Sequence, residues 1–166
     1  MSTQASQTRR AILAIFWLGA ALAAPAHAEE LPMFAVANPQ SQITIDHTIW
    51  GEILSRYLIV NPIVINRFDY RRVTSADRTR LQSYIALLQA VNPATLAAAE
   101  QHAYWINFYN SLTVEVILEH YPVQSIRDIS SGWFKPGPWD LKLVTVKGKR
   151  LSLNNIELDI LRKYWK

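Results

Sequence analysis

One stretch of helical sequence constrains the fold of this chain more than any other feature. Residues 97–120 are predicted to form a single helix, which Pro122 ends just beyond its last turn. Residues 103–109 in its middle read AYWINFY, so a single amide, Asn107, lies among large apolar side chains. A helix that is apolar all round is buried on nearly every side. We therefore expect this helix to be the centre of a globular domain.

The remaining periodicity predicts a mainly helical α+β fold. Residues 47–58 are predicted to form a helix and residues 68–73 a short strand. A second helix runs from an N-cap at Ser75 to Val91, with one apolar face made of Leu81, Tyr84, Ile85, Leu88 and Val91. Near the C-terminus, residues 141–146 and 150–153 predict a short β-hairpin around Lys147-Gly148. A final helix follows, capped by Ser152 or Asn154, with an apolar face of Ile156, Ile160 and Leu161.

The N-terminus has the pattern of a secretory signal peptide. Arg9 and Arg10 precede an uncharged apolar run at residues 11–24, and Ala26-His27-Ala28 follows. The run is shorter than the roughly 20 residues that a membrane-spanning helix needs. We expect cleavage between Ala28 and Glu29, which leaves no permanent membrane anchor, and a periplasmic or secreted location. An uncleaved anchor is the alternative. Residues 29–44 are expected to be an extended lead-in, and residues 45–166 a single domain.

Charge and composition exclude several classes of function. The chain has 17 basic and 13 acidic residues, and two of the basic ones lie in the signal segment. The rest are interspersed, so no nucleic-acid partner is expected. The absence of cysteine excludes disulfides and thiolate chemistry in this chain. His47, His102 and His120 do not have the spacing of metal ligands, so no metal or other cofactor is expected.

The candidate binding residues are Trp105, Asn107 and Asn110. The two amides are three residues apart and therefore share one face of the central helix. A buried amide needs a hydrogen-bond partner, because leaving one unsatisfied costs roughly 1–3 kcal/mol. The partner can be a backbone group of a neighbouring segment, an ordered water or a ligand, so two interpretations stay open: the amides tie a loop to the helix, or they bind a ligand. The first is favoured, and Trp105 is likewise more typical of a core than of a ligand groove. No catalytic residue is assigned; Glu157, near the start of the final helix, is expected to form a salt bridge with a nearby arginine.

Two blocks of sequence together resemble a known family. They are residues 103–110, AYWINFYN, and residues 146–157, VKGKRLSLNNIE, followed by Ile160-Leu161-Arg162. This pattern resembles the domain of unknown function 547, found in bacterial exported proteins and in plant proteins with a leucine-zipper region. The resemblance extends from about Ile45 to Arg162. It implies that similar proteins continue into a segment with cysteine and histidine, and that many have a histidine where this chain has Leu158.

These observations predict an exported cell-envelope protein that is a non-catalytic structural or binding module. The alternative is that the chain is the truncated scaffold part of a cysteine-dependent hydrolase or transferase. We expect an incomplete domain that self-associates through exposed apolar surface; no other partner is identified.

Export gives the first testable prediction. The intact mass of the protein recovered from the periplasm should correspond to a chain that starts at Glu29. Signal peptidase cleaves after a triplet with small residues at its first and last positions, and Ala26-His27-Ala28 is such a triplet. A membrane-bound species that retains Met1 would contradict this prediction.

Overall fold

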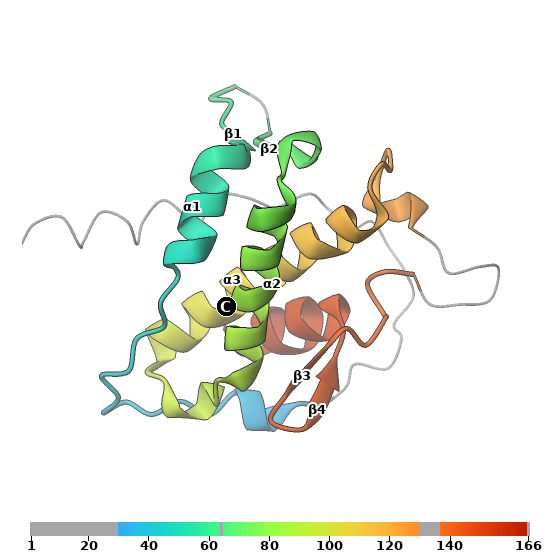
Figure 1. Ribbon diagram of the computed structural model, residues 1–166. Coiled ribbons are helices and arrows are strands. Elements are labelled where there is room, and N and C mark those ends of the chain that lie inside the picture. Colours follow the sequence, from blue (N-terminus) through green and yellow to red (C-terminus); the bar gives the residue numbers. More distant parts are fainter. Residues whose placement is uncertain (1–29, 64, 130–136, 166) are drawn as a thin grey trace, which may run out of the picture.

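The computed structural model describes residues 30–63, 65–129 and 137–165. The predicted signal segment and its cleavage position at Ala28 and Glu29 lie outside the described residues. Helices surround one long central helix, and two small antiparallel hairpins lie apart from one another (Figure 1). The prediction of a mainly helical α+β fold with a hairpin near the C-terminus is confirmed. No helix in the described part of the chain is long and apolar enough to cross a membrane.

The central helix, α3 (Ala98–His120), is buried through its middle as predicted. Tyr104, Trp105 and Phe108 are fully buried. The ring of Trp105 meets the ring of Phe34 edge-on at 5.1 Å and stacks on that of Phe108 at 6.3 Å. A hydrogen bond of 2.9 Å from the hydroxyl of Tyr104 to the carbonyl of Leu88 satisfies the only polar group of that side chain. Large rings with few polar atoms therefore make α3 the element against which the others pack.

Helix α2 (Ser75–Ala90) packs against α3, and helix α1 (Thr48–Tyr57) packs against α2. Helix α1 buries Trp50, Ile53, Leu54 and Tyr57. Helix α2 buries four of the five residues of its predicted apolar face, and the fifth, Val91, lies just past its end against the core. The N-cap of α2 is Thr74 instead of Ser75. Thr74 has an extended backbone, and its side chain accepts a hydrogen bond from the N–H of Asp77, which is the geometry of an N-cap.

The strand predicted at residues 68–73 is wrong in length. Only β2 (Arg67–Phe68) is extended, and it pairs with β1 (Leu58–Ile59). The chain then turns into a short 3₁₀ helix, η2 (Tyr70–Arg72). In this turn the ring of Tyr70 packs on that of Phe68 at 4.9 Å. In a strand, residues 68 and 70 would also share one face. The sequence pattern therefore does not distinguish the predicted strand from this turn.

Residues 30–44 are not the plain extended lead-in that the sequence suggests. They contain the 3₁₀ helix η1 (Pro32–Phe34), which starts with proline at its first position. Leu31 and Phe34 are buried in the same core as α3. The side-chain amide of Gln101 donates a hydrogen bond of 3.1 Å to the carbonyl of Phe34. This segment is thus part of the domain, and two further 3₁₀ helices, η3 (Pro93–Thr95) and η4 (Ile126–Asp128), flank α3 in sequence.

The predicted C-terminal hairpin is present but shorter. Strands β3 (Val144–Val146) and β4 (Lys149–Leu151) pair in the antiparallel register that the turn requires. Lys147 and Gly148 both have positive φ, at 51° and 76°. Two successive left-handed residues are typical of the tight two-residue turns that match the twist of a hairpin, and glycine adopts that conformation without strain.

The final helix begins as predicted but has an unexpected geometry. Ser152 and Asn155 form a reciprocal cap: the hydroxyl of Ser152 accepts from the N–H of Asn155, and Oδ1 of Asn155 accepts from the N–H of Ser152. The helix then continues as a π-helix, η5 (Asn155–Leu161), and ends as α4 (Arg162–Tyr164). π-Helical turns are rare, and many of those known lie at functional sites. No periodicity in the sequence distinguishes this one from an α-helix.

Candidate functional site

The middle of α3 carries both predicted amides into the protein interior. The exposed fraction is 3% for Asn107 and 6% for Asn110. The amide oxygen of Asn107 is buried and accepts no hydrogen bond among the described residues. A buried carbonyl-type acceptor with free lone pairs can bind an N–H or O–H donor of another molecule or segment.

Trp105 lies in the core and does not line a surface. Its side chain is fully buried between the rings of Phe34 and Phe108, which is the packing of a core residue. Its indole N–H also lacks an acceptor among the described residues. Of the two alternatives for Trp105, the structure favours the core. The residue can fix the position of α3 and thereby that of Asn107, two residues further along the helix.

A polar contact joins α3 to the π-helix beside these amides. The hydroxyl of Tyr109 donates to Oε2 of Glu157 at 2.7 Å, and Arg162 forms an ion pair with Oε1 of the same carboxylate. The predicted salt bridge of Glu157 with a nearby arginine is thus confirmed. Burial, and then the hydrogen bond to Glu157, raises the pKa of Tyr109 well above its usual value. Tyr109 therefore remains a protonated donor, and both oxygens of Glu157 are occupied.

A second polar cluster at the start of η5 was not predicted from the sequence. Oδ1 of Asn155 accepts from Lys142 at 2.6 Å and from the hydroxyl and N–H of Ser152. Its Nδ2 donates to Oδ2 of Asp159 at 2.7 Å. Asn155 thus uses both ends of its amide, in contrast to Asn107. The serine three residues before an amide is the only sequence signal for this cluster, because a capping box has that spacing.

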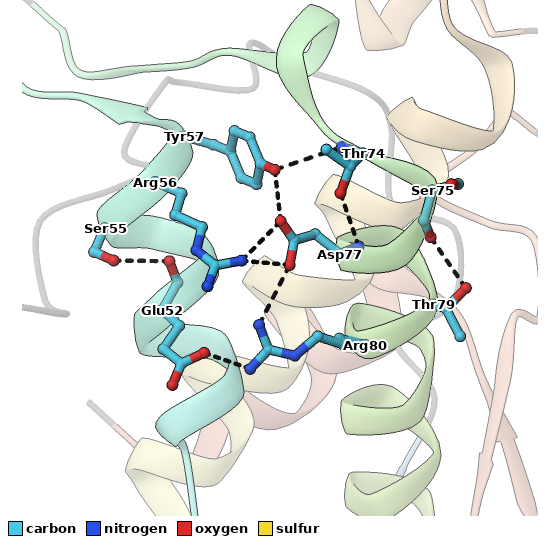
Figure 2. Close-up of polar contacts among 9 residues, drawn as sticks. All are labelled: Glu52, Ser55, Arg56, Tyr57, Thr74, Ser75, Asp77, Thr79 and Arg80. Carbon is cyan, nitrogen blue, oxygen red and sulfur yellow. Dashed lines mark hydrogen bonds and ion pairs between the residues drawn. The ribbon is translucent and has the colours of Figure 1, made fainter.

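The largest charged cluster joins α1 to α2 (Figure 2). The carboxylate of Asp77 is buried and accepts hydrogen bonds from Tyr57 at 2.6 Å and from Arg56 at 2.7 and 2.9 Å. Arg80 contacts the same carboxylate at 3.3 Å and also pairs with Glu52. None of these five residues was predicted: Arg80 and Asp77 are three residues apart on α2, but the other contacts join residues about twenty or more positions apart on different helices.

The contacts around Asp77 are those of a structural clamp. The hydrogen bond from Tyr57, with those from Arg56 and Arg80, lowers the pKa of Asp77 from 3.8 to about 2 despite its burial. A carboxylate with so low a pKa stays ionised at neutral pH and is a poor proton donor or acceptor there. Its partners also occupy both of its oxygens. We therefore assign this cluster to holding α1 against α2.

A half-buried histidine, the N-cap of α1, pairs with a buried tyrosine on α2. Nδ1 of His47 lies 2.5 Å from the hydroxyl of Tyr84. Burial lowers the pKa of His47 and raises that of Tyr84, so both groups are held neutral. Nε2 of His47 and the indole N–H of Trp50 are buried without partners among the described residues. Among the described residues, the hydroxyl of Tyr84 is the side-chain group that contacts this histidine.

The described residues also place His102 and test the arrangement of possible metal ligands. The ring of His102 stacks on that of Trp165 at 6.3 Å, which gives it a packing role and half-buries the indole near the C-terminus. Within residues 30–63, 65–129 and 137–165, no group of three or more histidine, aspartate or glutamate side chains is arranged to hold a metal ion.

Comparison with known proteins supports the family resemblance over part of the chain. Residues 93–166 match the family described as "Protein of unknown function, DUF547". The matched segment contains η3, α3, the β3–β4 hairpin and η5, and so includes Asn107, Tyr109 and Glu157. It is shorter than the resemblance inferred from the sequence, which began near Ile45. No curated protein and no solved structure matches the chain.

The Asp77 cluster gives a pH-dependent prediction. Replacing Asp77 by Asn should lower the free energy of unfolding by about 1.5–3 kcal/mol near neutral pH, because hydrogen bonds to a charged group are lost. Since the pKa of Asp77 is lowered in the folded state to about 2, its stabilising effect is complete above its usual pKa and is lost as the pH falls through about 2. In urea denaturation, the difference between wild type and Asp77→Asn should therefore shrink as the pH falls from about 4 to about 2. Asp128→Asn, a change at an exposed aspartate, is the control and should have little effect at any pH. A difference for Asp77→Asn that is independent of pH would contradict the clamp.

Proposed function

We propose that this chain is an exported, non-catalytic binding module of the cell envelope, and that Asn107 on α3 accepts a hydrogen bond from its ligand or partner. The observation that carries the proposal is the buried, unpartnered oxygen of Asn107. Leaving such an acceptor unsatisfied costs the folded protein roughly 1–3 kcal/mol. Native proteins contain few groups of this kind. Where one is present, binding is a physical reason to retain it, because a ligand supplies the missing donor.

The surroundings of Asn107 support a preorganised site. Tyr104, Trp105 and Phe108 fix the helix on which Asn107 lies, because all three are fully buried. The hydrogen bond from Tyr109 to Glu157 fixes the same turn of α3 to the π-helix. An amide held in this way loses little conformational entropy when it binds, and preorganisation of that kind increases affinity. Asn110, one turn further along the same helix, is a second buried amide beside it.

The chemistry of the proposed ligand follows from the acceptor. It presents an N–H or O–H group, as an amide, a sugar or a peptide does. It does not need to be charged, because the amide of Asn107 is neutral. The composition supports binding in preference to catalysis: the chain contains no cysteine, and the buried carboxylate of Asp77 is fully paired. Export is supported by the signal-like N-terminus described above.

Matched substitutions at two buried asparagines test the proposal. Asn107→Leu should leave the free energy of unfolding unchanged or increase it, because the change removes an acceptor that the free protein does not satisfy. Asn155→Leu is the control and should lower the free energy of unfolding by roughly 1–3 kcal/mol, because its amide is hydrogen-bonded at both ends. Urea denaturation of both variants measures this difference.

Binding itself can be measured on the same two side chains. Adding the dialysable fraction of a periplasmic extract should shift the NMR signals of the side-chain amide of Asn107 and leave those of Asn155 in place. If Asn107→Leu destabilises the protein as much as Asn155→Leu does, the amide is a structural tie. Unchanged Asn107 signals in the extract would contradict the binding role.

A further inference from the structure

The loop that joins β1 to β2 exposes an unusual number of aliphatic side chains. The exposed fractions are 53% for Ile59, 69% for Val60, 91% for Ile63 and 54% for Ile65. We call these four residues the apolar tip. Single exposed apolar side chains are normal on protein surfaces, whereas a group of them marks an interaction site. The tip projects from one end of the molecule, at the C-terminal end of α1 (Figure 1).

Side-chain hydrogen bonds give the base of this loop a defined conformation. The N–H of Asn61 donates to Oδ1 of Asn66 at 3.0 Å, across the loop. The N–H of Ile63 donates to Oδ1 of Asn61 at 2.9 Å, which is an Asx-type turn. The aliphatic side chains are thus displayed by a turn that the loop forms with its own polar groups.

Three arginines lie next to the apolar tip, and we call them the arginine flank: Arg67, Arg71 and Arg72. Arg67 is directly opposite Ile59 in the β1–β2 pairing. Arg71 and Arg72 lie on η2, which follows β2 after one residue. All three are exposed, and none forms an ion pair with a described residue.

The arginine flank differs in this respect from its neighbours along the chain. The next arginines along the chain on either side do form ion pairs, Arg56 with Asp77 and Arg78 with Glu115. Residues 65–72 hold these three arginines and one carboxylate, Asp69, so a net positive charge remains beside the apolar projection. Such a charge attracts an anionic surface.

We propose that the apolar tip and the arginine flank dock on the surface of a bilayer that contains anionic phospholipids. A projecting group of aliphatic side chains can enter the boundary between headgroups and acyl chains, and arginines beside it can bind the phosphates. Charge complementarity favours a bilayer over an apolar groove of another protein, because the flank requires negative charge around the point of insertion. The docking is peripheral and is additional to the proposed role of Asn107.

Co-sedimentation with vesicles tests this inference directly. The processed protein isolated from cells is mixed with vesicles of phosphatidylcholine, with and without phosphatidylglycerol. We expect binding to the vesicles with phosphatidylglycerol, weakening as salt is added because the arginine contribution is screened. Arg71→Gln and Arg72→Gln should each lower the partition coefficient about fivefold, which corresponds to the usual contribution of one basic residue at an anionic surface.

A matched pair of isoleucines separates insertion from general hydrophobicity. Ile65→Asp should lower the partition coefficient roughly tenfold or more, because an inserted side chain is lost and a negative charge is added. Ile43→Asp is the control: Ile43 has a similar exposed fraction, 52%, but lies in a segment without lysine or arginine from residue 29 to residue 55. It should leave vesicle binding unchanged. Both positions are exposed, so the melting temperature should be unchanged and reports whether each variant is folded.

Several outcomes would overturn the proposal. One is the absence of sedimentation with phosphatidylglycerol vesicles. A second is equal loss of binding in Ile65→Asp and Ile43→Asp, since binding would then not depend on the apolar tip. A third is equal binding to both kinds of vesicle by wild type and by the arginine variants. If the wild type binds no vesicle but Ile65→Asp releases a co-purifying soluble protein, the loop is a protein-binding site instead.

Discussion

The burial of the aromatic middle of α3 is the constraint on which the rest of the structure depends. Tyr104, Trp105 and Phe108 remove three large rings from water on one helix, and apolar burial of this size is the dominant favourable contribution to folding. Segments far apart in the sequence supply the surfaces that cover them: η1 through Phe34, α2 through Leu88, and the final helix through Ile156 and Ile160. If α3 were exposed to water, these segments would lose the apolar surface against which they pack.

Polar interactions then decide how these elements are oriented around α3. The carboxylate of Asp77 fixes α1 to α2, and the Tyr109–Glu157 contact fixes α3 to η5. In both cases a buried or half-buried acceptor is fully hydrogen-bonded, which is the usual state of polar groups in a native protein. The oxygen of Asn107 departs from that state among the described residues, as do one side-chain oxygen of Gln101 and one of Glu115. The proposed binding role rests on this contrast between satisfied and unsatisfied groups within one helix bundle.

The sequence predicted the features that local patterns encode. Periodicity located α1, α2 and α3, the Lys147-Gly148 turn located the second hairpin, and Ser152 was among the caps expected for the final helix. The predictions failed where distant residues decide the structure. The β1–β2 pairing needs contact between residues on both sides of a loop, and the π-helix differs from an α-helix only in its hydrogen bonds. The burial of the two amides could be predicted from the apolar stretch around them, but whether their oxygens find donors depends on neighbours in space.

Helix α3, buried through its middle, should be the most stable element and should hold Asn107 in a rigid environment. Native-state hydrogen exchange of the backbone amides measures this directly, because amides in the most stable element exchange only through global unfolding. The account predicts that the amides of residues 104–114 exchange most slowly, with an opening free energy equal to that of global unfolding. Exchange of these amides through local opening, faster than that of the amides in α2, would contradict it.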